Sequence, residues 1–210
     1  MGKIPNNFHI IYGLAENFGW DEYEHYVGEV GKTMKRPKAD PFNIIRYLAI
    51  KSTYDTNRPD NIFFYYKHEP YGEWWDRAQQ YITPIHVEPP TEIFGNPVHN
   101  YAHQADVMRL QILIEDGGIY IDSDVLCLKS FEPLRESGPF IMGQESNNPG
   151  KLGNCIMMSE KDAEFPKIWL GEYTTFDDDK WVDHSIVLPY HLSTRHPNLI
   201  NILDHKKLGC

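Results

Sequence analysis

The chain has 210 residues, of which 41% are hydrophobic and 24% are charged, and its formal net charge is −10. This composition fits one soluble α/β domain with a substantial core, and the acidic balance argues against a nucleic-acid surface, which needs clustered Lys and Arg. No segment has the length of a membrane span, and the N-terminus lacks a signal-peptide pattern. We therefore expect residues 1–210 to form a single domain, either alone or as the N-terminal part of a longer protein.

The first half of the chain shows apolar runs separated by helical patterns and turn residues. The predicted elements are a strand at 8–12, a helix from Asp40 to about Tyr54, a strand at 62–66, a helix at 72–81, and one short strand near 85–87 within an otherwise irregular 82–97. Asp40 is the predicted N-cap of the first helix and Pro41 its first residue. The densest basic stretch, residues 32–38, is predicted to be a loop.

The second half continues this alternation. The predicted elements are a helix at 100–115, an apolar β-prone run at 117–128, strands at 140–142 and 154–158, and helices at about 162–172 and 183–193. The segment Asp116–Gly118 is expected to end the first of these helices. Alternating helices and strands predict an α/β fold with a mostly parallel sheet.

Two carboxylates, Asp122 and Asp124, lie one residue apart inside the apolar run at 117–128. In an extended chain, side chains i and i+2 share one face, so the pair would repel if buried. A divalent cation held by oxygen ligands would relieve that repulsion. The pair is thus a candidate metal site, and the alternative is an acidic strand end that caps the next element.

A second Asp-x-Asp occurs at Asp177–Asp179, between Phe176 and Lys180. It lacks the apolar frame of the first copy. Acidic clusters in such surroundings are usually solvated. We predict a solvent-exposed turn there.

The helix predicted at 100–115 is apolar almost all round, so it should be buried. Asp106 and Arg109 share one of its faces, which predicts either an i, i+3 ion pair or a pair of ligands for polar hydroxyl groups. His99 and His103 have a spacing that can hold zinc, but the Glu of the metalloprotease motif is replaced by Asn100. We therefore predict that both histidines pack at the N-terminal turn.

Three cysteines, Cys127, Cys155 and Cys210, give neither a disulfide framework nor a zinc-site spacing. Cys127 and Cys155 have apolar neighbours and are predicted to be inert core thiols. This pattern predicts a reducing, cytoplasmic location.

These residues together resemble the signature of GT-A glycosyltransferases whose sugar-binding region carries an Asp-x-Asp motif. That signature is Ala-Asp-x-x-Arg on a helix, followed by Gly-Gly-x-Tyr-x-Asp-x-Asp, and it is matched by residues 105–109 and 117–124. The group includes the yeast initiating mannosyltransferases and, more distantly, the glucosylating domains of large clostridial toxins. A weaker similarity covers most of residues 8–158, and size and acidity also resemble chlorovirus glycosyltransferases that decorate a viral capsid protein, which would imply the host cytoplasm.

The resemblance implies a Rossmann-like GT-A domain that binds Mn²⁺ or Mg²⁺ and a UDP-sugar. Such an enzyme would transfer a hexose or deoxyhexose to a glycan or glycoprotein with retention of configuration. In that comparison Asp122 and Asp124 would hold the metal, and Ser123 would lie beside the UDP-sugar. The other implied roles are donor-sugar contacts by Asp106, Arg109 and Asn154, uracil stacking by Tyr12, and a further metal contact from His184, His191 or His205.

Three hypotheses follow from the residues and the resemblance. The first is the metal-dependent glycosyltransferase. The second is a metal-dependent phosphohydrolase, which would need further clustered ligands near Asp122 and Asp124. The third is an inactive nucleotide-sugar-binding module. For Tyr12, the alternative to uracil stacking is a purely structural core aromatic.

Overall fold

The computed structural model describes residues 2–15, 20–27, 30–37, 41–145 and 150–204, with the backbone alone described in 20–27 and 30–37. The helices are α1 (Ile44–Asn57), α2 (Glu73–Ala78), α3 (Tyr101–Asp116), α4 (Glu164–Gly171) and α5 (Leu188–Arg195). The strands of the main sheet are β1 (Asn7–Ile11), β4 (Asn61–Tyr66), β5 (Thr83–His86), β8 (Gly118–Ile121), β9 (Phe140–Gln144), β10 (Leu152–Ser159) and β11 (Asn201–Leu203). Two hairpins, β2 (Trp20–Val27) with β3 (Val30–Pro37) and β6 (Glu92–Ile93) with β7 (Asn96–Pro97), form separate two-stranded sheets.

The main sheet has the order β11-β9-β10-β8-β1-β4-β5. Strands β8, β1, β4 and β5 pair in parallel, as do β11 and β9, whereas β10 runs antiparallel to both of its neighbours. The predicted α/β fold with a mostly parallel sheet is therefore confirmed. The antiparallel β10 makes this a mixed sheet, a common variation in large sheets.

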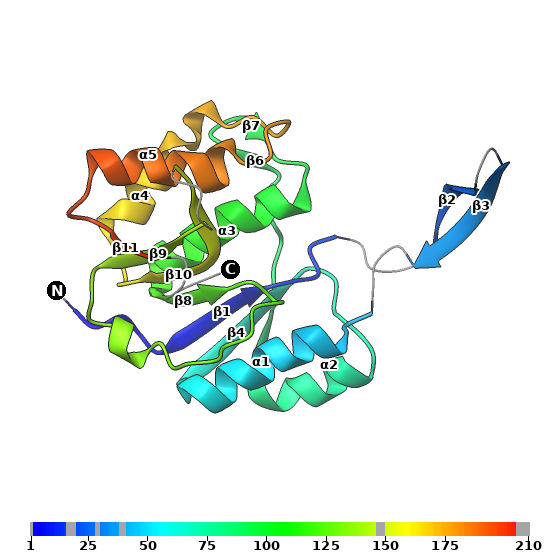
Figure 1. The fold of residues 1–210 in the computed structure, drawn as a ribbon, viewed down its shortest axis with the longest axis horizontal. Coiled ribbons are helices and arrows are strands. Elements are labelled where there is room, and N and C mark those ends of the chain that lie inside the picture. The colour runs from blue at the N-terminus through cyan, green and yellow to red at the C-terminus, as the bar shows by residue number, and fades with distance from the viewer. Residues whose placement is uncertain (1, 16–19, 28–29, 38–40, 146–149, 205–210) are drawn as a thin grey trace.

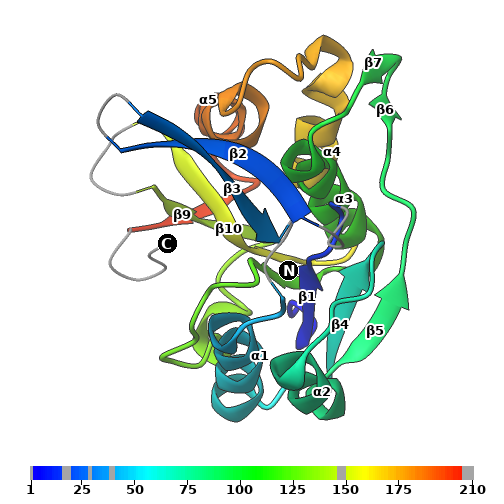
Figure 2. The same ribbon diagram turned by 90° about the vertical axis from the view of Figure 1, so that its right-hand side faces the viewer.

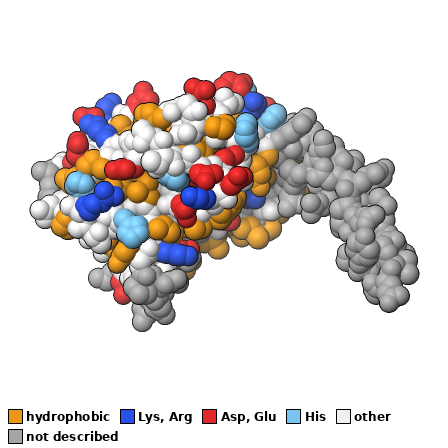
Figure 3. All heavy atoms as spheres, turned by 90° about the horizontal axis from the view of Figure 1, so that it is seen from above, with side chains coloured by type: hydrophobic (Ala, Val, Ile, Leu, Met, Phe, Trp, Pro, Cys, Tyr) orange, Lys and Arg blue, Asp and Glu red, His pale blue; other side chains and the backbone are white. Residues whose placement is uncertain are grey.

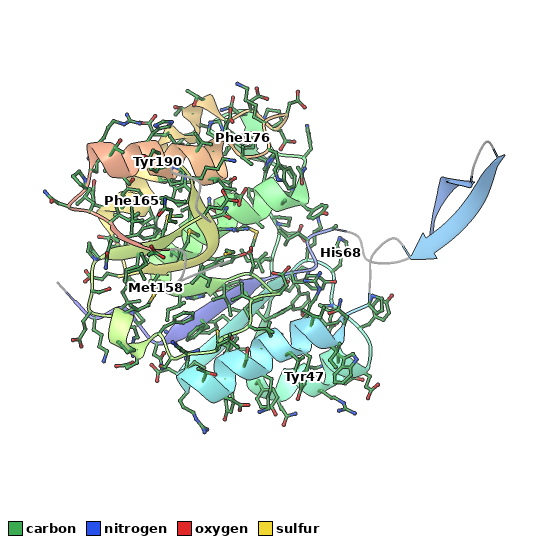
Figure 4. The ribbon with its side chains drawn as sticks, in the orientation of Figure 1. Tyr47, His68, Met158, Phe165, Phe176 and Tyr190 are labelled. Carbon is green, nitrogen blue, oxygen red and sulfur yellow. The ribbon has the colours of Figure 1, made fainter. Side chains whose placement is uncertain are left out.

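Helices cover both faces of the sheet. Figures 1 and 2 show α1 and α2 on one face and α3, α4 and α5 on the other. Strand alternation divides the core accordingly, as β8 illustrates: Ile119 and Ile121 join the cluster on the α1 side, whereas Tyr120 joins the cluster on the α3 side. In Figure 4, Tyr47 lies on the α1 side, while Phe165 and Tyr190 lie on the side of α4 and α5.

The chain adds strands to one side of β1 first and then to the other side. From β1 the chain builds outward through α1 to β4 and through α2 to β5, and then α3 returns it on the opposite face to β8, on the other side of β1. At such a switch point, the connections after two neighbouring parallel strands leave toward opposite faces, and a crevice opens at the carboxyl ends of the strands. The fold therefore locates a binding crevice after β1 and β8.

The turn between α3 and β8 depends on two glycines. Gly117 and Gly118 have positive φ angles of 66° and 99°. A Cβ on Gly118 would lie 2.7 Å from the Asn7 carbonyl oxygen and 2.8 Å from His9 Nε2, distances too short to tolerate. The Gly-Gly of the signature thus lets the end of α3 pass close to β1, directly before the strand that leads to the Asp pair.

Several predicted boundaries are wrong. Helix α1 begins at Ile44, and its cap is Asn43, whose side chain accepts hydrogen bonds from the backbone N–H groups of Ile45 and Arg46. The predicted cap, Asp40, lies outside the described residues. A Pro41 start placed the helix too early because Asn43, a residue equally suited to capping, was overlooked.

Other differences concern segments for which the sequence predicts loops. Residues 32–37 belong to β3, and the stretch 82–97 contains β5, β6 and β7 instead of one short strand. Strand β11 was not predicted. The helices expected at 72–81, 162–172 and 183–193 are present but include 3₁₀ turns at Gln79–Tyr81 and Glu172–Thr175 and a π turn at Asp183–Val187.

The two apolar cysteines differ in state. Cys127 is a buried free thiol, as predicted, and burial raises its pKa. Cys155 is disulfide-bonded, so its interpretation as an inert core thiol is wrong. The predicted reducing, cytoplasmic location stays a prediction.

Charged and apolar side chains are mixed on the surface. Figure 3 shows acidic, basic and hydrophobic side chains interspersed on the face seen from above. Among the helices within the described ranges, none is long and apolar enough to cross a membrane.

Candidate active site

A cleft of about 430 Å³ lies after β1 and β8, where the reversal of strand order locates a crevice. Its lining residues are Ile11, Tyr12, Gly13, Leu14, Ala15, Arg46, Tyr101, Ala102, Ala105, Arg109, Tyr120, Asp122, Ser123 and Asp124. Five residues predicted from sequence for the site, Tyr12, Arg109, Asp122, Ser123 and Asp124, are thus brought together. They come from segments far apart in the sequence, namely the end of β1, the helix α3 and the turn after β8.

The Asp pair does not lie on a strand. Strand β8 ends at Ile121, and residues 123–124 form a turn in which the Val125 N–H donates to the Asp122 carbonyl. The prediction that alternation places both carboxylates on one strand face is therefore wrong. Asp122 is one-third exposed and Asp124 is exposed, so the repulsion is relieved by solvent and by the turn. Both carboxylates still face the same cleft.

Asp122 is fixed by two neighbours. Its Oδ1 accepts a hydrogen bond from the Tyr120 hydroxyl at 2.6 Å and lies 3.6 Å from Arg109 Nη1. Burial raises the pKa of Tyr120 well above its ordinary value, so the hydroxyl keeps its proton and acts as the donor. Only one oxygen of Asp122 is engaged in these contacts, and the other is left for a ligand in the cleft.

Arg109 links several groups at the base of the cleft. Its guanidinium is 8% exposed and donates to the carbonyls of Ala105 at 3.2 Å and Asn154 at 3.0 Å. Burial alone would lower its pKa, but Tyr120, Asp122 and Asp106 raise the pKa above the ordinary value, so the side chain stays charged. Its centre also lies 4.5 Å from the Tyr120 ring centroid.

Asp106 and Asn154 support Arg109 from behind and do not line the cleft. Asp106 Oδ1 lies 3.3 Å from Arg109 Nη2 and accepts a hydrogen bond of 2.9 Å from Asn154 Nδ2. The i, i+3 ion pair, one of the two sequence interpretations, is therefore present. Burial raises the pKa of Asp106, and the charge of Arg109 opposes that rise. The predicted sugar contacts of Asp106 and Asn154 stay predictions.

Sequence reasoning missed Arg46, which lines the cleft from the first turn of α1. Its guanidinium lies 4.2 Å from the centroid of the Tyr12 ring and donates a hydrogen bond to Ser123 Oγ. The ring of Tyr12 also contacts Phe42 edge-on at 5.8 Å and Phe64 at 6.4 Å. No local pattern marks Arg46, because its partners Tyr12 and Ser123 come from distant parts of the chain.

The Asp pair fits a divalent cation that also contacts a ligand. Asp124 makes no hydrogen bond or ion pair with the described residues, and Asp122 has one uncommitted oxygen. Carboxylate oxygens are hard ligands, and Mg²⁺ or Mn²⁺ sites commonly use one or two carboxylates together with substrate phosphates and water. Within the described residues, no group of three or more His, Cys, Asp or Glu side chains is arranged to hold a metal. The described part of the chain therefore offers two carboxylates, and the ligand would supply other oxygens.

Two of the histidines named as further metal ligands, His184 and His191, do not line this cleft. His184 is buried, with its ring 5.3 Å from those of Tyr173 and Phe176 and its Nε2 3.3 Å from Thr175 Oγ1. His191 is exposed on α5 beside Tyr190. Neither lines the cleft, and His205 lies outside the described residues.

The second Asp-x-Asp also lies in a turn, as predicted, but its middle residue is only 18% exposed and is hydrogen-bonded. Asp178 Oδ2 accepts from the backbone N–H groups of His99 at 2.9 Å and Asn100 at 3.2 Å, and its Oδ1 lies 2.7 Å from His103 Nδ1. Burial alone would raise the pKa of Asp178, but these hydrogen bonds lower it below the ordinary value. Asp178 thus anchors the start of α3. Of the two histidines predicted to pack there, His103 is buried, whereas His99 is exposed.

The sequence match to the glycosyltransferase sugar-binding region containing the DXD motif extends over residues 23–141. That span is more than half of the chain and contains the signature residues Asp106, Arg109, Asp122 and Asp124. The chain belongs to this glycosyltransferase family. Tyr12 and Asn154 lie outside the matched span, so their placement near the site comes from the structure.

Two further proteins and one solved structure are similar to this chain. Glucan organizing enzyme 1 of Cryptococcus neoformans var. grubii is 33% identical over 97% of this chain, and the chain spans 53% of that protein. An uncharacterized Arabidopsis thaliana protein is 32% identical over 49% of the chain and 17% of its own length. The solved PaToxG glycosyltransferase has a TM-score of 0.59 with 14% identity, over 92% of this chain and 70% of that one, which shows a shared fold.

Family and fold together identify a GT-A-like glycosyltransferase. Proteins of this DXD-containing family generally use a divalent metal, a nucleotide-sugar and a sugar acceptor. The chain spans about half the length of Glucan organizing enzyme 1, so the activity and partners of the whole protein belong to the proposal below.

Proposed function

We propose that this protein is a metal-dependent glycosyltransferase that moves a hexose or deoxyhexose from a UDP-sugar to a glycan or glycoprotein, with retention of configuration. The observation that carries the proposal is the cleft at the switch point, which gathers Tyr12, Arg109 and the Asp122–Asp124 turn. Retention and the uracil nucleotide rest on the family resemblance.

In this proposal Asp122 and Asp124 hold Mn²⁺ or Mg²⁺ against the diphosphate of the donor. A bound divalent cation neutralises the charge that develops on the leaving diphosphate. Tyr120 and Arg109 orient Asp122, since both contact the same carboxylate oxygen and leave the other free. The uracil end of the donor would lie toward Tyr12, at the end of β1.

The donor sugar would lie near Arg109. Asp106 and Asn154 hold the guanidinium in place, so in this proposal they act on the sugar chiefly through Arg109. Preorganised donors of this kind stabilise charge without reorganisation during the reaction. The name of the Cryptococcus relative makes a glucan a reasonable first acceptor to test. A viral capsid acceptor and a cytoplasmic location stay predictions.

The deciding experiment is a screen of UDP-, GDP- and other nucleotide-sugars for release of the nucleotide, with and without Mn²⁺ and glucan acceptors. We expect Mn²⁺-dependent release from a UDP-sugar, accelerated by an acceptor, and an unchanged anomeric configuration in the product by NMR. Calorimetry with UDP, with and without Mn²⁺, accompanies the screen.

Each alternative predicts a different result. Tight metal-dependent UDP binding with no release from any nucleotide-sugar would favour the inactive binding module. Release of inorganic phosphate from simple phosphate esters would favour the phosphohydrolase. The structure argues against that second alternative, because the described residues hold no third His, Cys, Asp or Glu ligand with the Asp pair.

A further inference from the structure

We infer that Arg46 binds the diphosphate of the donor, an inference that rests on the proposed function and adds a residue to it. Arg46 is not part of the Asp-x-Asp signature and lies in α1, on the opposite face of the sheet from α3. It reaches the cleft beside Ser123, the middle residue of the Asp122–Asp124 turn. A group bound to a cation between the two carboxylates would therefore meet Arg46 at close range.

The hydrogen-bonding capacity of the two cleft arginines points to Arg46. Arg109 uses its guanidinium N–H groups on Ala105, Asn154, Asp106 and Asp122, and it is almost fully buried. Among the described residues, Arg46 donates a hydrogen bond to one acceptor, Ser123 Oγ, and its Nε is buried without a partner. A guanidinium has five N–H donors, so Arg46 keeps several for an anionic ligand.

The distribution of charge in the cleft also indicates Arg46 as the residue that binds the diphosphate. Among the described residues that line it, Arg46 and Arg109 are the cations, and Asp122 and Asp124 are the anions. The ion pair with Asp106 offsets Arg109, and a divalent cation would be offset by the two carboxylates. Arg46 is then the remaining positive charge available to a diphosphate. A planar guanidinium suits phosphate oxygens because it donates in a fork.

The Tyr12 ring holds Arg46 in this position. The guanidinium lies over one side of the ring, which is itself supported by Phe42 and Phe64. Such cation–π contact orients the guanidinium while leaving its edge free for hydrogen bonds. In this arrangement the guanidinium covers one face of the Tyr12 ring, so uracil cannot stack on that face. Uracil would instead stack on the guanidinium plane, contact another surface of the ring, or bind after Arg46 has moved aside.

The test compares UDP with uridine, which lacks the diphosphate. We would measure UDP affinity by calorimetry in saturating Mn²⁺ and uridine binding by ligand-detected NMR, for wild type, Arg46→Gln and Arg46→Lys. Arg46→Gln should weaken UDP binding about ten- to hundredfold, the range for a lost hydrogen bond to a charged group, and change uridine binding less than about twofold. Arg46→Lys should recover part of the UDP affinity, because it restores charge without the fork.

Arg77→Gln is the matched control. Arg77 also lies over an aromatic ring, that of Trp74 at 4.9 Å, but its side chain is exposed on α2 and does not line the cleft. Its substitution should leave UDP binding unchanged.

Wild-type UDP affinity in Arg46→Gln, or equal losses for UDP and uridine, would overturn the inference while leaving the proposed function standing. Absence of UDP binding by the wild-type protein itself would overturn both.

Discussion

The two Asp-x-Asp segments of this chain share a pattern and differ in what their carboxylates contact. In Asp122–Asp124 the outer carboxylates face the cleft, and the middle residue Ser123 bonds to Arg46. In Asp177–Asp179 the middle carboxylate of Asp178 is engaged in holding the start of α3. Both segments lie in turns, so backbone conformation does not separate them. The preceding elements separate them, because the Asp122–Asp124 turn follows the central strand β8 and the Asp177–Asp179 turn follows the 3₁₀ turn at Glu172–Thr175.

The largest expected effect is a loss of UDP affinity on substitution of the outer carboxylates, and we expect it in the first segment and not in the second. Asp122→Asn or Asp124→Asn should reduce Mn²⁺-dependent UDP affinity roughly a hundredfold or more. Each substitution removes a ligand of the metal, and a bound metal contributes several kcal/mol of charge stabilisation. Asp177→Asn and Asp179→Asn should bind UDP like wild type. Calorimetry with and without Mn²⁺ measures the difference, and circular dichroism checks the fold. Equal effects of the two sets of variants would remove the distinction between the segments.

The second prediction contrasts the cations beside each segment. Arg109→Ala should lower the free energy of unfolding by about 3–5 kcal/mol, because it leaves the buried Asp106 without its partner. Lys180→Ala removes the exposed partner of Asp177 and should change the free energy of unfolding by less than about 0.5 kcal/mol. Chemical denaturation of both variants gives the two values.

A rescue experiment sharpens the assignment for Arg109. Adding Asp106→Asn to Arg109→Ala should restore part of the lost stability, since the unpaired buried charge is then removed. In the conservative variant Arg109→Lys, affinity for the intact UDP-sugar should fall more than affinity for UDP. Equal losses for the two ligands would assign Arg109 a structural role alone.

The third prediction contrasts the aromatic neighbours. Tyr12→Ala should weaken UDP binding by about 1–3 kcal/mol, the range for an aromatic contact with a base, whereas Tyr12→Phe should be nearly neutral. Phe176 precedes the second segment and is buried against Tyr173 and His103. Phe176→Ala should therefore lower the melting temperature without changing the UDP affinity of the folded protein. A lowered melting temperature with unchanged UDP affinity in Tyr12→Ala would make Tyr12 a core aromatic like Phe176.

Much of the fold was predictable because apolar runs and helix stops are local signals. Strands β1 and β4 and helix α3 occur where hydrophobic patterning places them, and Gly117 ends α3 as expected. The predicted start of α1 is too early because the sequence offers two good caps close together, Asp40 and Asn43, and the local pattern does not choose between them. The short strand predicted near 85–87 corresponds to β5, whereas strands such as β6 and β11 have too few apolar residues to be recognised without their partners in the sheet.

The candidate site was predictable to the extent that it lies in one continuous signature. Asp106, Arg109, Asp122 and Asp124 could be named from the spacing between α3 and the turn after β8. Arg46 could not, because its contacts with Tyr12 and Ser123 exist only once β1 and β8 are paired. The role of Asp178 was hidden for the same reason, since its partners begin a helix formed from residues far earlier in the chain.

The smallest expected effect concerns Asp178 itself. Asp178→Ala removes the acceptor for two backbone N–H groups and for His103, so it should lower the free energy of unfolding by about 1–2 kcal/mol. Asp178→Asn keeps an oxygen acceptor and should lose less. UDP affinity should be unchanged in both variants, in contrast to the variants of the first segment.

The pH dependence of stability separates the contribution of the Asp178 negative charge from that of its hydrogen-bond geometry. Because the folded state lowers the pKa of Asp178, its carboxylate stabilises the protein above the unfolded pKa of about 4, and this contribution is lost as the pH falls through the lower folded value. The stability difference between wild type and Asp178→Asn should therefore be constant between about pH 5 and 7 and shrink below about pH 4. Denaturation curves across this range measure it. A difference that does not shrink in acid would assign the stabilisation to hydrogen-bond geometry alone, and the negative charge of Asp178 would then be as dispensable as those of Asp177 and Asp179.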